Sequence, residues 1–155
     1  MKIKKIAALI LPAAIMALIF YFSSQNADTS SKTSGGIAEF IARVFCDTDK
    51  LYSGERQWVI NTLQVIIRKG AHFTIYMILG FFMANLMGSF GIRYWFSPII
   101  CFIYAVSDEI HQYFVPGRSC EIRDMFIDLS GSILGTLAFV LTLRIVRRIK
   151  NGWSL

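Results

Sequence analysis

The stretch AHFTIYMILGFFMANLMGSF, residues 71–90, decides the fold class, because His72 is its only ionisable side chain. An apolar run of this length matches the roughly 20 residues that a helix needs to cross about 30 Å of hydrocarbon. Gly91 and Arg93 follow, which is enough for a tight turn, and a second apolar stretch begins near Ile92. The two stretches therefore predict neighbouring membrane-spanning helices.

Working outward, four stretches are apolar enough to predict spans: residues 6–22, 71–90, 92–115 and 122–146. Pro116 and Gly117 mark the turn between the third and the fourth. The first follows three lysines within residues 1–5 and is interpreted as an uncleaved anchor, with a cleaved signal peptide as the alternative. We expect an all-α, polytopic membrane protein with four transmembrane helices, built as a single domain over residues 1–155.

The composition favours the same class. Of 155 residues, 55% are hydrophobic and 17% are charged, which is too apolar for a disordered chain. The net charge is +6, but the basic residues flank apolar stretches as lipid-headgroup anchors do, so nucleic-acid binding is not expected. Cys46, Cys101 and Cys120 form no CxxC pair, which argues against a disulfide scaffold and a structural zinc site.

The basic flanks predict the orientation. With four crossings and a cytoplasmic N-terminus, the inner side holds eight basic residues and no acidic one, namely Lys2, Lys4, Lys5, Arg93, Arg144, Arg147, Arg148 and Lys150. The outer side receives the other eight basic residues and all ten acidic ones. Because Lys and Arg in short flanks favour the cytoplasm, we expect both termini inside the cell, with residues 147–155 as a cytoplasmic tail.

Residues 23–70 form the long segment outside the predicted spans. Residues 23–36 are rich in Ser, Thr and Gly and predict a flexible link. Two apolar patterns at helical spacing follow: Ile37, Ile41 and Val44, then Val59, Leu63, Ile66 and Ile67. They predict one or two amphipathic helices at the outer membrane interface. A soluble four-helix core is the alternative, but it leaves the uninterrupted apolar stretches unexplained.

Ionisable side chains within the spans are costly in a bilayer and indicate a functional site. Counting about 1.5 Å of helical rise per residue from the predicted inner ends places several of them in the outer third of the membrane. They come from three spans: His72, Asp108, His111, Asp124 and Asp128. This convergence predicts a polar pocket open to the outer surface, with a purely structural ion-pair network as the alternative.

Helical periodicity predicts which side chains share a face. The sets are Tyr104, Asp108, His111 and Gln112 on the third span, Arg68, His72 and Tyr76 on the second, and Asp124, Asp128 and Gly131 on the fourth. Gly131 and Gly135 form a small-xxx-small pair that lets another helix approach, within one chain or between two.

Charges next to these faces complete the predicted site. Asp108 and Glu109 are adjacent and predict different faces; the structural alternative is that one of them only pairs with Arg118. Lys69, Arg118 and Arg123 form a predicted basic rim, which would offset part of the carboxylate charge and could hold phosphate.

Several of these residues also carry a resemblance. FSSQ closes the first span at residues 22–25, RKGAHF opens the second at 68–73, and SDEIHQ occupies 107–112. These are followed by Phe114, Pro116-Gly117-Arg118, Arg123-Asp124, Asp128 and Gly131. In order and spacing the chain resembles the VanZ-like family of small bacterial integral membrane proteins over nearly its whole length. It departs at Asp128, where the family pattern usually has Asn, so that an ionised Asp128 adds a negative charge.

The resemblance implies a role at the cell envelope, because the family is named after a protein associated with reduced sensitivity to the glycopeptide antibiotic teicoplanin. Glycopeptides act outside the membrane on peptidoglycan precursors, so an outer pocket is suitably placed. We expect a protein of the cell membrane that affects glycopeptide sensitivity or handles a lipid-linked cell-envelope molecule. Its expected partners are membrane lipids and a lipid-linked cell-wall precursor or a glycopeptide, and no cofactor is expected.

A membrane-embedded enzyme acting on a lipid-linked substrate is the alternative function. Its candidate acid and base groups are His72, Asp108, Glu109, His111 and Asp124. Its candidate ligand-binding residues are Lys69, Tyr76, Gln112, Arg118, Arg123 and Asp128. Two His and several carboxylates are also a metal-donor set, so the alternative enzyme is either acid/base or metal-dependent. Glu109 and His111 diverge at i and i+2, so His72 would have to close a metal site from another span, and no metal ligand is assigned. A transporter is least favoured, because the chain shows no repeat and no broken-helix pair. The ligand and the oligomeric state stay open.

Overall fold

The computed structural model describes residues 2–45 and 52–152. These residues form five α-helices and one short 3-10 helix, which confirms the all-α prediction. The elements are α1 (Lys2–Ser23), α2 (Ala27–Phe45), α3 (Ser53–Ser89), η2 (Tyr94–Phe96), α4 (Ser97–Tyr113) and α5 (Ile122–Gly152).

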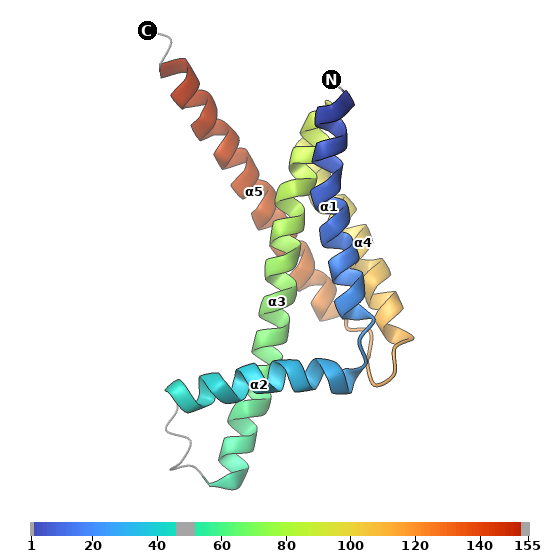
Figure 1. Ribbon diagram of the computed structural model, residues 1–155, viewed down its shortest axis with the longest axis vertical. Helices are drawn as coiled ribbons and strands as arrows, with labels where there is room; N and C mark the ends of the chain where they lie inside the picture. The colour runs from blue at the N-terminus through green and yellow to red at the C-terminus, as the bar shows by residue number, and fades with distance from the viewer. Residues whose placement is uncertain (1, 46–51, 153–155) are drawn as a thin grey trace.

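The helices are arranged as a bundle with one helix lying across it (Figure 1). In this view α1, α3 and α4 run side by side, and α5 crosses behind them at an angle. The helix α2 lies across α3 near the lower end of the bundle, while both chain ends lie at the upper end.

Among the described residues, three segments are long and apolar enough to cross a membrane: Lys5–Ser23, Ser53–Ser89 and Ile122–Asn151. Their large apolar side chains are widely exposed, as at Ile6 (61%) and Leu141 (59%). A contiguous exposed apolar surface of this kind belongs in lipid rather than in water. The chain is therefore a multi-pass membrane protein.

The predicted flexible link at residues 23–36 is wrong, because most of it is the first half of α2. The side chain of Asn26 caps this helix by accepting a hydrogen bond from the backbone N of Thr29 at 2.9 Å. Further along, Ala38 and Ala42 are completely buried. Burial of this apolar face stabilises a helix that the Ser, Thr and Gly composition alone does not favour.

The boundaries of the predicted spans also differ from the structure. The predicted interfacial helix and the second span form one continuous helix, α3, because Gly70 does not interrupt it. A helical glycine costs only about 1 kcal/mol relative to alanine, so neighbouring turns can carry it.

The third helix, α4, covers Ser97–Tyr113 instead of residues 92–115. Gly91 adopts a positive φ of 75° in the turn, and Pro98 sits in the first turn of α4, where its missing N–H costs nothing. The fourth helix, α5, begins at Ile122 as predicted and continues beyond residue 146 to Gly152.

Glycines allow α3 and α5 to pack in direct backbone contact. A Cβ on Gly131 would overlap the carbonyl oxygen of Phe73, and a Cβ on Gly135 would overlap that of Met77. On the other helix, Gly80 lies against the backbone of Ser132 in the same way. The predicted close approach at the glycine pair is confirmed, and the neighbouring helix belongs to the same chain.

Buried hydroxyl groups link three helices within the apolar core. The Ser97 hydroxyl of α4 donates to the carbonyl oxygen of Gly80 in α3 at 2.9 Å. The Thr136 side chain of α5 lies 3.3 Å from the Ser97 oxygen. Such hydrogen bonds stabilise helix association where the surroundings contain no water.

We expect Gly135→Ala to destabilise the protein, because the added methyl group meets backbone that cannot rotate away. Overpacking of this kind costs about 1–3 kcal/mol. The measurement is the free energy of unfolding in mixed detergent micelles. Gly88→Ala is the matched control, since a Cβ there meets nothing within 4 Å. An equal response of both variants would contradict the close contact.

Candidate functional site

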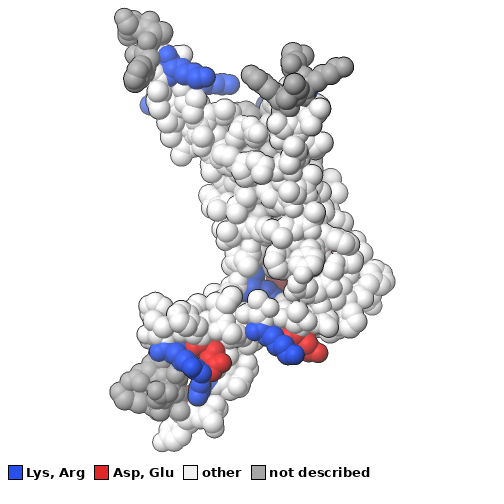
Figure 2. Space-filling view, in the orientation of Figure 1, with Lys and Arg blue, Asp and Glu red and all other residues white. Residues whose placement is uncertain are grey.

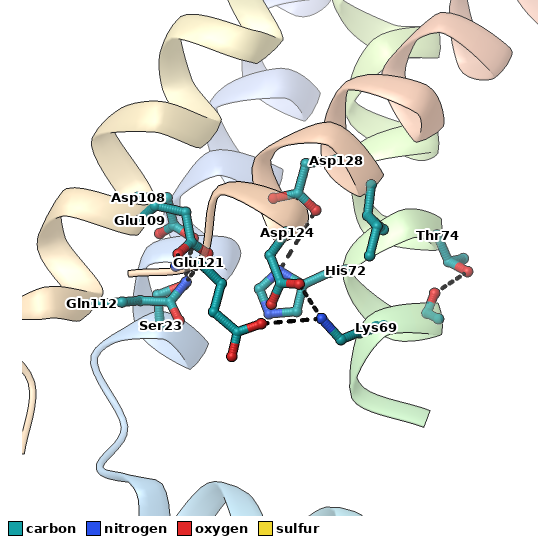
Figure 3. Close-up of polar contacts among 12 residues, drawn as sticks. Ser23, Lys69, His72, Thr74, Asp108, Glu109, Gln112, Glu121, Asp124 and Asp128 are labelled. Atoms are coloured by element: carbon teal, nitrogen blue, oxygen red, sulfur yellow. Dashed lines mark hydrogen bonds and ion pairs between the residues drawn. The ribbon is translucent and has the colours of Figure 1, made fainter. Parts of the chain in front are cut away.

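Charged and polar side chains gather where α1, α3, α4 and α5 meet at the lower end of the bundle (Figure 3). They form two groups. Asp108, Glu109 and Gln112 lie together near Ser23, while His72 and Lys69 of α3 point toward carboxylates of α5. The predicted convergence of polar groups from separate helices is present in the structure.

Gln112 holds the first group together. Its amide nitrogen donates to Asp108 at 3.0 Å and to Glu109 at 3.2 Å. All three side chains are buried, with exposed fractions of 6% or less. The two carboxylates diverge as predicted: Asp108 accepts from the Ser23 hydroxyl at 2.8 Å, and Glu109 accepts from the backbone N of Glu121 at 2.9 Å. The Gln112 amide still reaches both carboxylates, because it lies four residues after Asp108 and three after Glu109.

Arg118 completes this group, and among the described residues it does so without the ion pair that was the structural alternative for Asp108 or Glu109. Its Nη1 atom donates to the side-chain oxygen of Gln112 at 2.9 Å, and its Nη2 atom lies 3.3 Å from the carbonyl oxygen of Phe22. No ion pair joins Arg118 to a carboxylate in the part of the chain that the structure describes. Gln112 therefore separates the guanidinium group from Asp108 and Glu109.

The second group joins α3 to α5. Lys69 forms ion pairs with Asp124 and, at 3.3 Å, with Glu121. One turn further along α3, the Nδ1 atom of His72 lies 3.7 Å from a carboxylate oxygen of Asp128. Asp128 is completely buried, and neither of its oxygens has a hydrogen-bond partner among the described residues. The carboxylates of α5 thus face basic or titratable groups of α3 at successive turns.

The remaining predicted residues lie outside these two groups. His111 stacks on Phe20 with ring centroids 4.6 Å apart, and its Nε2 atom lies 3.1 Å from the Ser24 hydroxyl. Tyr76 is completely buried in the apolar core. Arg123 is exposed, and no hydrogen bond or ion pair connects its side chain to another described residue.

A pocket of about 260 Å³ opens beside the charged groups, between the end of α1, the first half of α2 and the middle of α3. Of the predicted site residues, His72 and Arg118 line it. Arg68 also lines it, although it was not among the candidate site residues. Arg68 lies one turn before His72 on the same helical face, and this spacing in the sequence indicates that both side chains point to the same region. Figure 2 shows basic surface set back between the upright helices and the helix that lies across them.

The described residues offer no group of three His, Cys, Asp or Glu side chains placed to hold a metal ion. Cys101 is a buried free thiol and Cys120 an exposed one. Cys46 and the side chains of Lys2 and Lys4, which entered the sequence predictions, lie outside the described residues.

Long apolar helices with exposed apolar side chains define a multi-pass membrane protein, and this one buries charged side chains near one end of its helix bundle. The chain belongs to the VanZ/LLP1 family, whose match covers residues 8–144. The resemblance stated from the sequence is thereby confirmed. No curated protein and no solved structure matches the chain.

We expect Gln112→Leu to lower stability by about 1–3 kcal/mol, because it leaves buried polar groups on three side chains without their shared partner. The measurement is the free energy of unfolding in mixed micelles. Gln57→Leu is the control: this side chain also bonds a neighbour, Asn61, at 2.9 Å, but it is exposed. Its effect should stay within about 0.5 kcal/mol. A loss of the same size in both variants would refute the bridging role of Gln112.

Proposed function

We propose that this chain is a single-domain, four-span protein of the bacterial cell membrane, with both termini in the cytoplasm. Its pocket lies near the outer leaflet, where it handles a lipid-linked cell-envelope molecule and affects sensitivity to glycopeptides such as teicoplanin. The observation that carries the proposal is the position of the pocket, between the buried charged groups and the transverse helix α2.

The length of α4 supports four crossings. Its 17 residues rise about 26 Å, and η2 adds a further turn at its start. Together they approach the roughly 30 Å of a hydrocarbon core. Exposed apolar side chains along α4, such as Ile99 (54%) and Ile103 (65%), suit contact with lipid.

The distribution of charge supports the orientation. On the face shown in Figure 2, acidic side chains are visible only in the lower part, while basic side chains appear at both ends. At the upper end, the Lys5 ammonium lies over the Phe90 ring, 4.9 Å from its centroid. A basic end without carboxylates is expected on the cytoplasmic side.

The geometry of α2 supports an interfacial position. It lies across the bundle, so it would lie in the membrane plane if the other helices cross the membrane. Its exposed apolar residues include Phe40 (69%) and Val44 (58%), while Glu39 and Arg43 form an ion pair on the same helix at 2.7 Å. Amphipathic helices of this kind rest at the boundary of headgroups and acyl chains. The pocket between α2 and the bundle then lies at headgroup level.

Topology reporters test the orientation. A fusion after Gly54 is expected to report the outside of the cell, and a fusion after Ile149 the cytoplasm. The opposite pattern would place the pocket at the inner leaflet and remove its access to extracellular ligands.

Glycopeptide sensitivity tests the role of the site. Expression in a susceptible host is expected to raise the inhibitory concentration of teicoplanin, and His72→Gln and Asp108→Asn are expected to abolish that rise. Lys32→Gln, an exposed change on α2, is the control and should retain the rise. Equal membrane levels of all variants must be confirmed. Resistance that survives both site variants would show that the charged groups do not serve this phenotype.

One observation favours the enzymatic alternative. His72 lines the pocket, and its Nδ1 atom lies 3.7 Å from the Asp128 carboxylate, too far for a hydrogen bond but near enough for the two groups to be considered as an acid and a base. Native mass spectrometry of the same His72→Gln variant separates the alternatives. If the chain is an enzyme, the His72→Gln variant should retain unconverted substrate, whose mass differs from that of the molecule bound to the wild type. If the chain is a binding protein, the variant should retain the same molecule as the wild type, or none.

A further inference from the structure

Two guanidinium groups converge on the pocket from different parts of the chain. Arg68 comes from the middle of α3, and Arg118 comes from the connection between α4 and α5. Burial lowers the pKa of Arg118 below its ordinary value, and the positive charge of Arg68 lowers it further. The arginine remains protonated nevertheless, so two like charges lie close together at one cavity.

No described carboxylate balances these charges within the pocket, because the lining contains neither Asp nor Glu. Lys69 pairs with the carboxylates of Asp124 and Glu121, and Gln112 lies between Arg118 and the carboxylates of Asp108 and Glu109, which attract Arg118 without an ion pair. Asp128 is buried, does not line the pocket and has no hydrogen-bond partner among the described residues. No described side chain forms an ion pair with Arg68. The Nε atom of Arg118 is buried without a hydrogen-bond partner. Two adjacent cations repel each other in a low-dielectric site. A bound anion would attract both of them and make the total electrostatic energy favourable.

The remaining lining indicates which anion fits. Guanidinium groups bind phosphate through their N–H donors. Arg68 uses none of its own in a described ion pair, and Arg118 offers those that do not point at Gln112 and Phe22, so the two can hold one phosphate from two sides. The Ser30 hydroxyl of α2 also lines the pocket and donates to no described acceptor. The apolar part of the wall consists of Ile19, Phe22, Ile37, Ile67, Ala71 and Ile75. A ligand that satisfies both parts carries a phosphate and an alkyl chain.

The size of the pocket limits how much of the ligand it encloses. Pockets that bury a whole drug-sized molecule measure about 300–1,000 Å³, and this one measures about 260 Å³. It can hold a headgroup and the first part of a chain, with the rest of the chain extending into the bilayer. A large soluble molecule does not fit.

We propose that Arg68 and Arg118 bind the phosphate of a membrane amphiphile whose alkyl chain leaves the pocket along its isoleucine-rich wall. The assignment rests on the proposed function for the location of the pocket at the membrane surface, and it names the class of ligand. It differs from the predicted basic rim, since Lys69 is occupied by carboxylates and Arg123 does not line the pocket.

Isothermal titration calorimetry on the full chain in dodecyl maltoside tests the assignment, because every probe then competes with a neutral amphiphile. The probes are dodecyl phosphate, dodecanoate and inorganic phosphate. We expect dodecyl phosphate to bind at least tenfold more tightly than inorganic phosphate, because about two buried methylene groups contribute a factor of ten. It should also bind more tightly than dodecanoate, which has one fewer acceptor oxygen.

Arg68→Gln is the decisive variant, because this side chain makes no described bond that folding would lose. It should weaken dodecyl phosphate binding by about tenfold or more, as expected for losing a charged hydrogen bond. Arg93→Gln removes the same charge at the other end of the bundle and should leave binding unchanged. Arg118→Gln should also weaken binding, and its folding is checked by size-exclusion chromatography.

Each alternative result has a definite meaning. Equal binding by wild type and Arg68→Gln overturns the assignment of Arg68. If inorganic phosphate binds as tightly as dodecyl phosphate, the ligand is not an amphiphile. If dodecanoate binds as tightly as dodecyl phosphate, the site does not prefer phosphate. If Arg68→Gln loses phosphate binding but keeps full teicoplanin resistance, the envelope function fails and the ligand assignment stands. If dodecyl phosphate does not bind while His72→Gln abolishes resistance, the ligand assignment fails and the envelope function stands.

Discussion

The direct backbone contact between α3 and α5 is the constraint on which the rest of the structure depends. Gly131 and Gly135 lie against successive turns of α3, at Phe73 and Met77. Because the two helices run in the same direction, this register also places Asp128 opposite His72 and Asp124 opposite Lys69. A side chain at either glycine would force the helices apart and separate these pairs as well.

Burial of the carboxylates inside the bundle leaves the basic groups to define the pocket. A polar group in hydrocarbon must find its partners within the protein, because no water reaches it. Asp108, Glu109 and Asp124 find such partners on neighbouring segments. Arg68 forms no ion pair with a described residue, and Arg118 keeps an unbonded Nε atom beside its contacts to Gln112 and Phe22; both side chains line the cavity. An acidic interior behind a basic pocket is thus the electrostatic layout from which the proposed ligand follows.

Much of this site could be predicted because helical periodicity alone determines which side chains share a face. Asp108 and Gln112 were expected on one side of their helix, and they are hydrogen-bonded there. Local composition was less reliable for α2, where Ser, Thr and Gly suggested a flexible link. The helix forms because Ala38 and Ala42 pack completely out of contact with solvent, and that packing depends on a surface distant in the sequence.

The sequence by itself determined the membrane class, the approximate spans, the shared helical faces and the family, since these depend on residue type and on spacing within a few turns. Only the tertiary structure decided which charges pair and which face a cavity. Lys69 was expected at a rim, yet it is bound to Asp124, 55 positions away, while Arg68 beside it lines the pocket. Neighbouring residues on one helix differ by about 100° in direction, so the register between distant helices assigned their roles.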